Sequence, residues 1–147
     1  MQLGIGMSFI KLRKMWEDDD GMVQVELSAS NGLFTTTQDF YAYPETLQEF
    51  GSQLSTYFPS GGKGEVPFEY GSENENYYSY VKVNAFYINV SAIGVHIRTN
   101  NKKDGYDFAT CEFCIESTLQ QVNELGKKIH AWARDMDSPL ECLMQNV

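Results

Sequence analysis

The sequence predicts an α+β domain in which a single curved antiparallel β-sheet of about six or seven strands packs on two α-helices. Short turn sequences separate runs in which apolar and polar residues alternate, which is typical of consecutive antiparallel strands. Two other stretches repeat apolar residues at helical spacing, and each needs a sheet face to cover it. The predicted order is βββαββββα, and the length of 147 residues fits one domain.

A three-stranded meander is predicted for residues 8–43. Its strands alternate or are rich in β-branched and aromatic residues, and they cover Ser8–Glu17, Met22–Ser30 and Leu33–Tyr43. Asp20-Gly21 and Asn31-Gly32 lie between them, and both pairs suit the positive φ angles of hairpin turns. Residues 1–7 are expected to be irregular. The first six lack the charged start and apolar block of a secretory signal.

The first helix is predicted to begin at Pro44 and to end near Phe58. Pro44 suits the first position of a helix, and Glu45 in the first turn suits the helix dipole. The apolar stripe consists of Leu47, Phe50, Leu54, Tyr57 and Phe58. The following PSGGKG lacks the spacing of a phosphate-binding loop and is predicted to be a flexible connector.

Four further strands and a second helix follow. The strands are predicted over Glu65–Tyr70, Tyr77–Ile88, Val90–Arg98 and Tyr106–Glu116, with a hairpin turn at Lys102–Gly105. Pro67 places the first of them near a sheet edge, because proline has no N–H to donate. Ser117 and Gln120 match a capping box for the second helix, and Gly126 on its apolar stripe is expected to allow close packing on the sheet. The tail, residues 135–147, is expected to be irregular.

The charge distribution favours a basic protein as partner. The formal net charge is −9, of which the first 80 residues carry −8 and the remaining 67 carry −1. The acidic half would repel nucleic acid and anionic membranes, whereas it would attract a basic protein. No apolar run approaches the roughly 18 residues of a membrane span. We therefore expect a cytoplasmic protein that binds neither nucleic acid nor membrane.

No catalytic, metal-binding or cofactor motif is present in the sequence. Cys111 and Cys114 form a C-x-x-C within a strand, which places the two thiols on opposite faces. With Cys142 the count is odd, which suggests free thiols in a reducing compartment. His96 and His130 have no metal-spaced partner, and no serine has a nucleophile-elbow context. The sequence predicts no metal, no cofactor and no enzyme activity.

One pattern spread over residues 33–132 resembles a known group of proteins. Its parts are an aromatic strand, the helix with Leu47-x-x-Phe50, the segment Phe68-Glu69-Tyr70-Gly71, the strand with Gly94-Val95-His96 and the last helix with Leu125-Gly126 and Trp132. The pattern is similar to small bacterial proteins that include immunity partners of polymorphic or contact-dependent growth inhibition toxins. The resemblance implies an immunity protein that neutralises a cognate toxin domain by binding it without catalysis. Many such toxins are nucleases with basic clefts.

Ten residues are the candidate toxin-binding residues. They are acidic or tyrosine side chains in two stretches of the N-terminal half, namely Asp18, Asp19, Asp20, Glu65, Glu69, Tyr70, Glu73, Glu75, Tyr77 and Tyr78. The acids would speed association with a basic partner, and the tyrosines would slow dissociation. The alternative is a solvated hairpin tip and an edge strand whose charges prevent aggregation.

Two other functions remain open at this point. One is a small-molecule-binding module, which a deep apolar pocket with a few convergent polar groups between sheet and helices would favour. The other is an enzyme, for which the sign would be carboxylates with shifted pKa values near His96.

Overall fold

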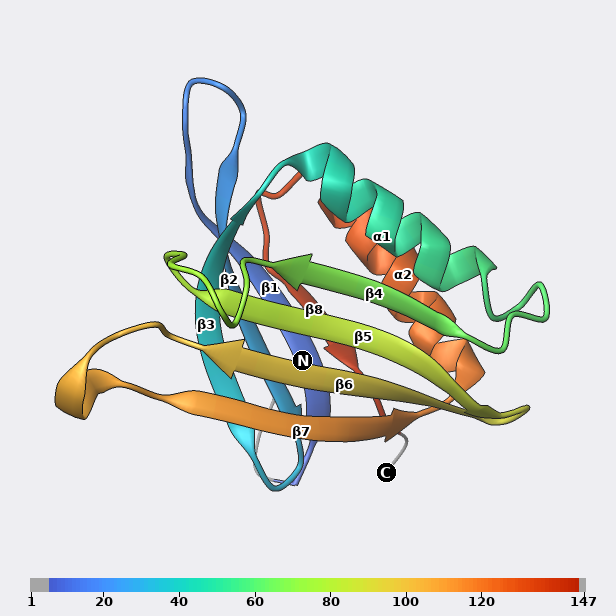
Figure 1. Ribbon diagram of the computed structural model, residues 1–147. Helices are drawn as coiled ribbons and strands as arrows, with labels where there is room; N and C mark the ends of the chain where they lie inside the picture. Colours follow the sequence, from blue (N-terminus) through green and yellow to red (C-terminus); the bar gives the residue numbers. More distant parts are fainter. Residues whose placement is uncertain (1–5, 146–147) are drawn as a thin grey trace.

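Two four-stranded antiparallel sheets form the frame of the molecule, in place of the single sheet that the sequence predicts (Figure 1). In the computed structural model, residues 6–145 are described. The first sheet has the order β3-β2-β1-β8 and the second has the order β4-β5-β6-β7. The strands of the two sheets cross one another in Figure 1. The chain leaves the first sheet after β3 and enters the second sheet at β4, with α1 between them. Hairpin signals before and after α1 predicted the strands, but they do not show that the strands belong to two sheets.

The first sheet contains the predicted meander and one strand from the far end of the sequence. Its strands are β1 (Ser8–Glu17), β2 (Val23–Asn31), β3 (Thr35–Ala42) and β8 (Leu140–Leu143). Alternate residues of β2 are buried, beginning with Val23 and Val25, so the other face of this sheet points outward. β8 pairs antiparallel with β1, from Leu12↔Leu140 to Phe9↔Leu143. The expectation of an irregular tail is therefore wrong for residues 140–143. The ends of the two stretches expected to be irregular, residues 1–5 and 146–147, lie outside the described residues.

The second sheet is built from four consecutive strands. They are β4 (Glu65–Tyr70), β5 (Tyr80–Asn89), β6 (Ala92–Asn100) and β7 (Thr110–Ser117). β4 lies at an edge, as Pro67 predicts. The side chains of Glu69, Lys82, Arg98 and Glu112 form one row across its outer face, since these residues are paired in register. The last turn differs from the prediction, because residues 101–109 form a longer connection that contains the 3-10 helix η1 (Gly105–Asp107).

Helices α1 (Pro44–Thr56) and α2 (Leu119–Trp132) run antiparallel and touch through their backbones (Figure 1). A Cβ atom added at Gly51 would lie 2.6 Å from the backbone N of His130 and 2.7 Å from the carbonyl oxygen of Gly126. Gly126 therefore permits close packing on another helix rather than on the sheet. α2 begins one residue later than the capping box predicts, because the Thr118 hydroxyl, not that of Ser117, accepts from the N–H of Gln121 at 3.1 Å.

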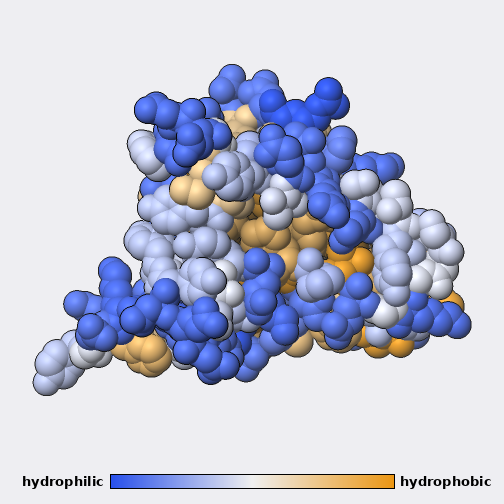
Figure 2. All heavy atoms as spheres, turned by 45° about the horizontal axis from the view of Figure 1, so that its top comes forward, coloured by the Kyte–Doolittle hydropathy of each residue, from blue (hydrophilic) through white to orange (hydrophobic). Residues whose placement is uncertain are grey.

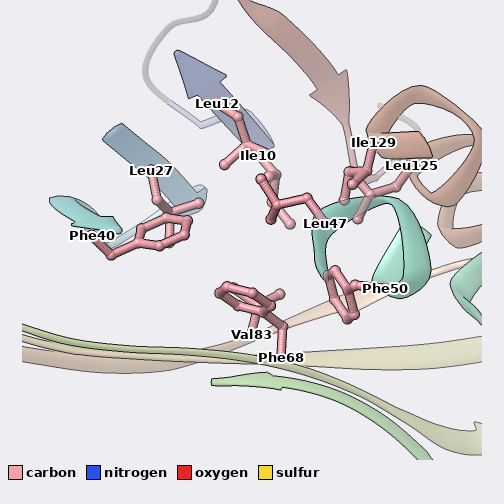
Figure 3. Close-up of a pocket in the computed structure, with 10 residues that line it drawn as sticks. All are labelled: Ile10, Leu12, Leu27, Phe40, Leu47, Phe50, Phe68, Val83, Leu125 and Ile129. Atoms are coloured by element: carbon pink, nitrogen blue, oxygen red, sulfur yellow. The ribbon is translucent and has the colours of Figure 1, made fainter. Parts of the chain in front are cut away.

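A continuous cluster of buried apolar residues joins both sheets and both helices. Figure 3 shows side chains from the strands of each sheet and from the two helices pointing into the same interior. With the top of Figure 1 tilted forward by 45°, apolar residues reach the surface at the centre of a face that is otherwise mostly hydrophilic (Figure 2). None of the helices within residues 6–145 has the length and apolar character needed to cross a membrane.

Candidate functional site

The structure places the ten predicted binding residues in three locations. Six of them, from Glu69 to Tyr78, lie together at the end of β4 and in the loop before β5. Glu65 lies at the opposite end of β4. Asp18, Asp19 and Asp20 form the turn between β1 and β2, which belongs to the other sheet. The linear stretch that holds most of the predicted acids is therefore not one continuous surface.

The three predicted tyrosines join a fourth, Tyr41 of β3, in a cluster of aromatic rings. The ring centroids of Tyr41 and Tyr78 are 5.2 Å apart, and those of Tyr70 and Tyr77 are 6.0 Å apart. Tyr41 and Tyr70 connect the two pairs at 6.4 Å, and Tyr70 lies 6.2 Å from Phe40 of the core. We call Tyr41, Tyr70, Tyr77 and Tyr78 the tyrosine cluster. Tyr70 packs against the core, whereas Tyr77 and Tyr78 are 44% and 53% exposed.

Asp39 fixes the exposed edge of the tyrosine cluster. Its carboxylate accepts hydrogen bonds from the Tyr78 hydroxyl and from the Gln24 amide, each at 2.6 Å, and its backbone oxygen accepts from the Ser79 hydroxyl at 2.7 Å. The hydrogen bond to Asp39, helped by burial, raises the pKa of Tyr78 to about 12. Tyr78 is therefore a neutral phenol at physiological pH, held in one orientation before any partner arrives.

Sequence reasoning missed Asp39 and Tyr41, although a signal for them exists. In the β3 sequence, Phe40 and Ala42 point into the core, so the alternation of a strand turns Asp39 and Tyr41 outward. Their contact with Tyr78 and Ser79 joins the two sheets, and residues 39 and 78 are far apart in the sequence. Local patterns do not predict such a pairing.

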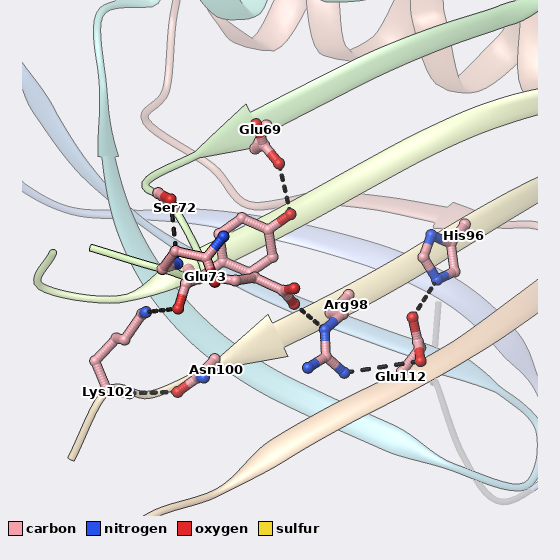
Figure 4. Close-up of polar contacts among 10 residues, drawn as sticks. Glu69, Ser72, Glu73, His96, Arg98, Asn100, Lys102 and Glu112 are labelled. Carbon is pink, nitrogen blue, oxygen red and sulfur yellow. Dashed lines mark hydrogen bonds and ion pairs between the residues drawn. The ribbon is translucent and has the colours of Figure 1, made fainter. Parts of the chain in front are cut away.

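The acids near the tyrosine cluster are largely paired (Figure 4). The Tyr80 hydroxyl donates to Glu69 at 2.5 Å, and the Arg98 guanidinium of β6 donates to Glu73. That hydrogen bond with Arg98 lowers the pKa of Glu73, and burial together with the bond to Glu69 raises the pKa of Tyr80. Lys102 Nζ donates to the backbone oxygens of Glu73 and Glu75 at 2.8 and 3.2 Å. Basic residues from the C-terminal half thus neutralise much of the charge that the sequence assigns to this loop.

His96 lies in a network of charged side chains on the outer face of the second sheet. His96 Nε2 lies 2.8 Å from Glu112, which also lies 3.7 Å from Arg98 (Figure 4). The shifted carboxyl pKa in this network is that of Glu73, and it is lowered, whereas a general acid at neutral pH needs a raised one. Burial, and then the charge of Glu112, raise the pKa of the Cys114 thiol, which keeps it protonated and weakly nucleophilic. Among residues 6–145 no group of three or more acidic, histidine or cysteine side chains is placed to hold a metal ion.

The turn between β1 and β2 carries two exposed acids, Asp19 and Asp20. Asp18 shapes this turn, because its carboxylate accepts from the N–H groups of Asp20 and Met22 at 2.8 and 3.0 Å. Asp19 and Asp20 are exposed, and their side chains have no hydrogen bond or ion pair within the described part of the chain. They are therefore available to a partner.

Trp16 connects this turn to the tyrosine cluster. Trp16, Gln24 and Tyr41 are paired in register across β1, β2 and β3, and residues in register share one face of a sheet. The Trp16 side chain is 52% exposed. The outer face of the first sheet thus carries Trp16, near the acidic turn, and Tyr41, of the tyrosine cluster, on either side of Gln24. We call Trp16, Asp19, Asp20 and the tyrosine cluster the aromatic–acidic surface.

The interior between the sheets and helices is filled. The cavity there measures about 20 Å³ and is lined by ten apolar residues: Ile10, Leu12, Leu27, Phe40, Leu47, Phe50, Phe68, Val83, Leu125 and Ile129 (Figure 3). A space of this size holds about one water, and its apolar lining offers no hydrogen-bond partner. It lacks the volume and the convergent polar groups of a small-molecule site.

Comparison with known proteins assigns no family to this chain. No family model matches the sequence, and no curated protein matches it. Among solved structures, the chain is similar to that of the plant transcriptional regulator PBF-2, with a TM-score of 0.48 and 14% sequence identity. The match covers 87% of this chain and 74% of that chain. A likeness at this level supports no statement about function.

Proposed function

We propose that this protein acts by binding another protein without catalysis, and that the aromatic–acidic surface is its binding site. The observation that carries the proposal is the tyrosine cluster, in which Asp39 and neighbouring rings hold two half-exposed tyrosines in place. Tyrosine and tryptophan dominate the binding energy of protein interfaces. Side chains already fixed in the free protein lose little conformational entropy when a partner binds.

The partner that fits this surface is basic. Asp19 and Asp20 are exposed and have no partner among residues 6–145, and the whole chain carries a net charge of −9. Such a field accelerates encounter with a positively charged protein, while the desolvated aromatic side chains determine how long the complex lasts.

An immunity protein is the specific form of this proposal. The sequence resembles small bacterial proteins that include immunity partners of growth-inhibition toxins, and a toxin that cleaves nucleic acid needs a basic, phosphate-binding cleft. In the proposed complex, Asp19 and Asp20 occupy positions that the phosphates of the toxin's substrate would take. The aromatic side chains bind beside that cleft, and the toxin is inhibited because its substrate is excluded.

The proposal predicts that the gene immediately upstream encodes a toxin domain, and the test uses that domain as the binding partner. We expect calorimetry to show a one-to-one complex, and cells that express the toxin to survive when this protein is present. Tyr78→Ala should weaken the complex about tenfold or more, which corresponds to the loss of a hot-spot side chain. Val90→Ala, at an exposed position on the β5–β6 turn, is the control and should bind as the wild type does. Absence of both binding and protection would overturn the proposed function.

A further inference from the structure

The connection between β6 and β7, residues 101–109, is longer than its topology requires. It joins two neighbouring antiparallel strands, and hairpins of this kind usually need a loop of about two to five residues. Here nine residues form a projecting loop that contains the short helix η1 (Figure 1). We call residues 101–109 the arm.

Hydrogen bonds from asparagine side chains give the arm a defined shape. The Asn101 amide donates to the backbone oxygen of Asp107 at 2.7 Å, and its oxygen accepts from the N–H groups of Lys103 and Ala109 at 3.1 and 3.0 Å. At the base, the Asn100 side chain accepts from the N–H of Lys102 at 2.8 Å. The shape of the arm thus depends on polar contacts rather than on burial of its own apolar side chains.

Two aromatic side chains project from the arm into solvent. Tyr106 is fully exposed and Phe108 is 54% exposed. Neither ring packs against another aromatic ring of residues 6–145. Exposed aromatic surface contributes nothing to the stability of the free protein, whereas burying it in a complex is favourable. A loop that is ordered without its aromatic residues is suited to inserting them into another molecule.

The base of the arm lies next to the tyrosine cluster. A surface hollow of about 340 Å³ is lined by Tyr78 and Asp39 on one side and by Asn101, Lys102 and Lys103 on the other. Lys102 also holds the loop that precedes Tyr77, through the backbone oxygens of Glu73 and Glu75. A protein that covers Tyr77 and Tyr78 is therefore brought beside the arm.

We propose that the arm is a second contact element for the same partner, and that Tyr106 inserts into an apolar pocket on it. This inference rests on the proposed function and deepens it. The pocket that fits has apolar walls for the ring and a hydrogen-bond acceptor at its far end for the phenol hydroxyl. The tyrosine cluster and the arm hold the partner on the two sides of the hollow between them.

The experiment compares dissociation constants and dissociation rates for complexes with the upstream-encoded toxin domain. Tyr106→Ala should raise the dissociation constant at least tenfold, mainly through faster dissociation. Tyr106→Phe keeps the aromatic ring and should therefore raise the dissociation constant less than Tyr106→Ala does. Val90→Ala is matched in exposure, since Val90 is 82% exposed, and it lies at the opposite end of β6, about 30 Å from the arm. Val90→Ala should leave the dissociation constant and the dissociation rate unchanged. Because Tyr106 makes no contact in the core, all three variants should unfold at the wild-type urea concentration.

The outcomes separate this inference from the proposed function. If Tyr106→Ala and the double variant Tyr106→Ala/Phe108→Ala bind as the wild type does while Tyr78→Ala binds weakly, the arm is not a contact element and the proposed function stands. If the wild type binds no toxin domain, the proposed function fails and the inference about the arm fails with it. If Tyr106→Ala loses affinity for the toxin domain while Val90→Ala binds as the wild type does, the result supports both the proposed function and the role of the arm.

Discussion

At the scale of single residues, Gly51 sets the distance between the two helices. Alanine has a higher helix propensity than glycine by up to about 1 kcal/mol, which by itself would stabilise α1. The added Cβ would meet backbone atoms of α2 at 2.6 and 2.7 Å, however, and backbone atoms have no alternative rotamer. We expect Gly51→Ala to lower the free energy of unfolding by about 1–3 kcal/mol, as overpacking of a core does. Urea unfolding measures this, and Ser52→Ala at the exposed neighbouring position is the control. A more stable Gly51→Ala would contradict the close contact of the helices.

Tyr78 gives the stability of the protein a dependence on alkaline pH. The phenol has a pKa of about 10 in an unfolded chain and about 12 in the folded protein. Between these pH values the unfolded state has lost a proton that the folded state retains, so stability falls as the pH rises. The difference in the free energy of unfolding between wild type and Tyr78→Phe should therefore be largest below pH 10 and should shrink as the pH approaches 12. Unfolding by urea across this range measures the difference, and a constant difference would show that Asp39 does not hold the phenol as described.

At the scale of elements, β8 shows that the end of the described chain is part of the fold. Leu140, Cys142 and Met144 are buried, whereas Glu141 between them lies outside the core and pairs with Lys11 at 3.7 Å. Leu140→Ala should cost about 2–5 kcal/mol in the free energy of unfolding, as large-to-small changes in a core do. Glu141→Ala should cost about 1 kcal/mol or less, since it removes a partly exposed ion pair. Similar losses in both variants, measured by urea unfolding, would mean that β8 is not packed on the core.

The elements were predictable where the signal is local. Some signals act within a few residues, namely turn residues such as Asn31-Gly32, the proline at the first position of α1 and the apolar stripes of both helices. They predicted nearly all strands and both helices. β8 was missed although Leu140, Cys142 and Met144 alternate with polar or less buried positions, because four residues after a proline give a weak pattern. Its stability comes from β1, more than 100 residues earlier in the sequence.

At the scale of the whole molecule, the candidate surface was predictable only in part. The tyrosines of the β4–β5 loop were identified by type, and Tyr70, Tyr77 and Tyr78 do lie together. The charge of that loop was not predictable, because its neutralisation by Arg98 and Lys102 depends on how β6 lies beside it. Glu69 and Glu73, two of the candidate toxin-binding residues, support the fold through Tyr80 and Arg98.

The charge of the whole molecule and the position of its acids make separable contributions to association. Asp19→Lys/Asp20→Lys changes the net charge from −9 to −5 at the acidic turn. Glu116→Lys/Glu124→Lys makes the same change at exposed positions on β7 and α2, outside the sheet that carries that turn. At low salt, we expect the first variant to associate with the upstream-encoded toxin domain at least about tenfold more slowly than the wild type. The association rate of the second variant should fall much less.

Raising the ionic strength should slow the wild type and reduce the difference between the two charge variants, because screening acts mainly on exposed charges that are separated by more than a Debye length. Stopped-flow measurements at several salt concentrations test this, and urea unfolding confirms that both variants are folded. Equal association rates for the two variants would show that net charge alone attracts the partner. The acidic turn would then be a solvated hairpin tip, and binding would depend on the tyrosine cluster and the arm.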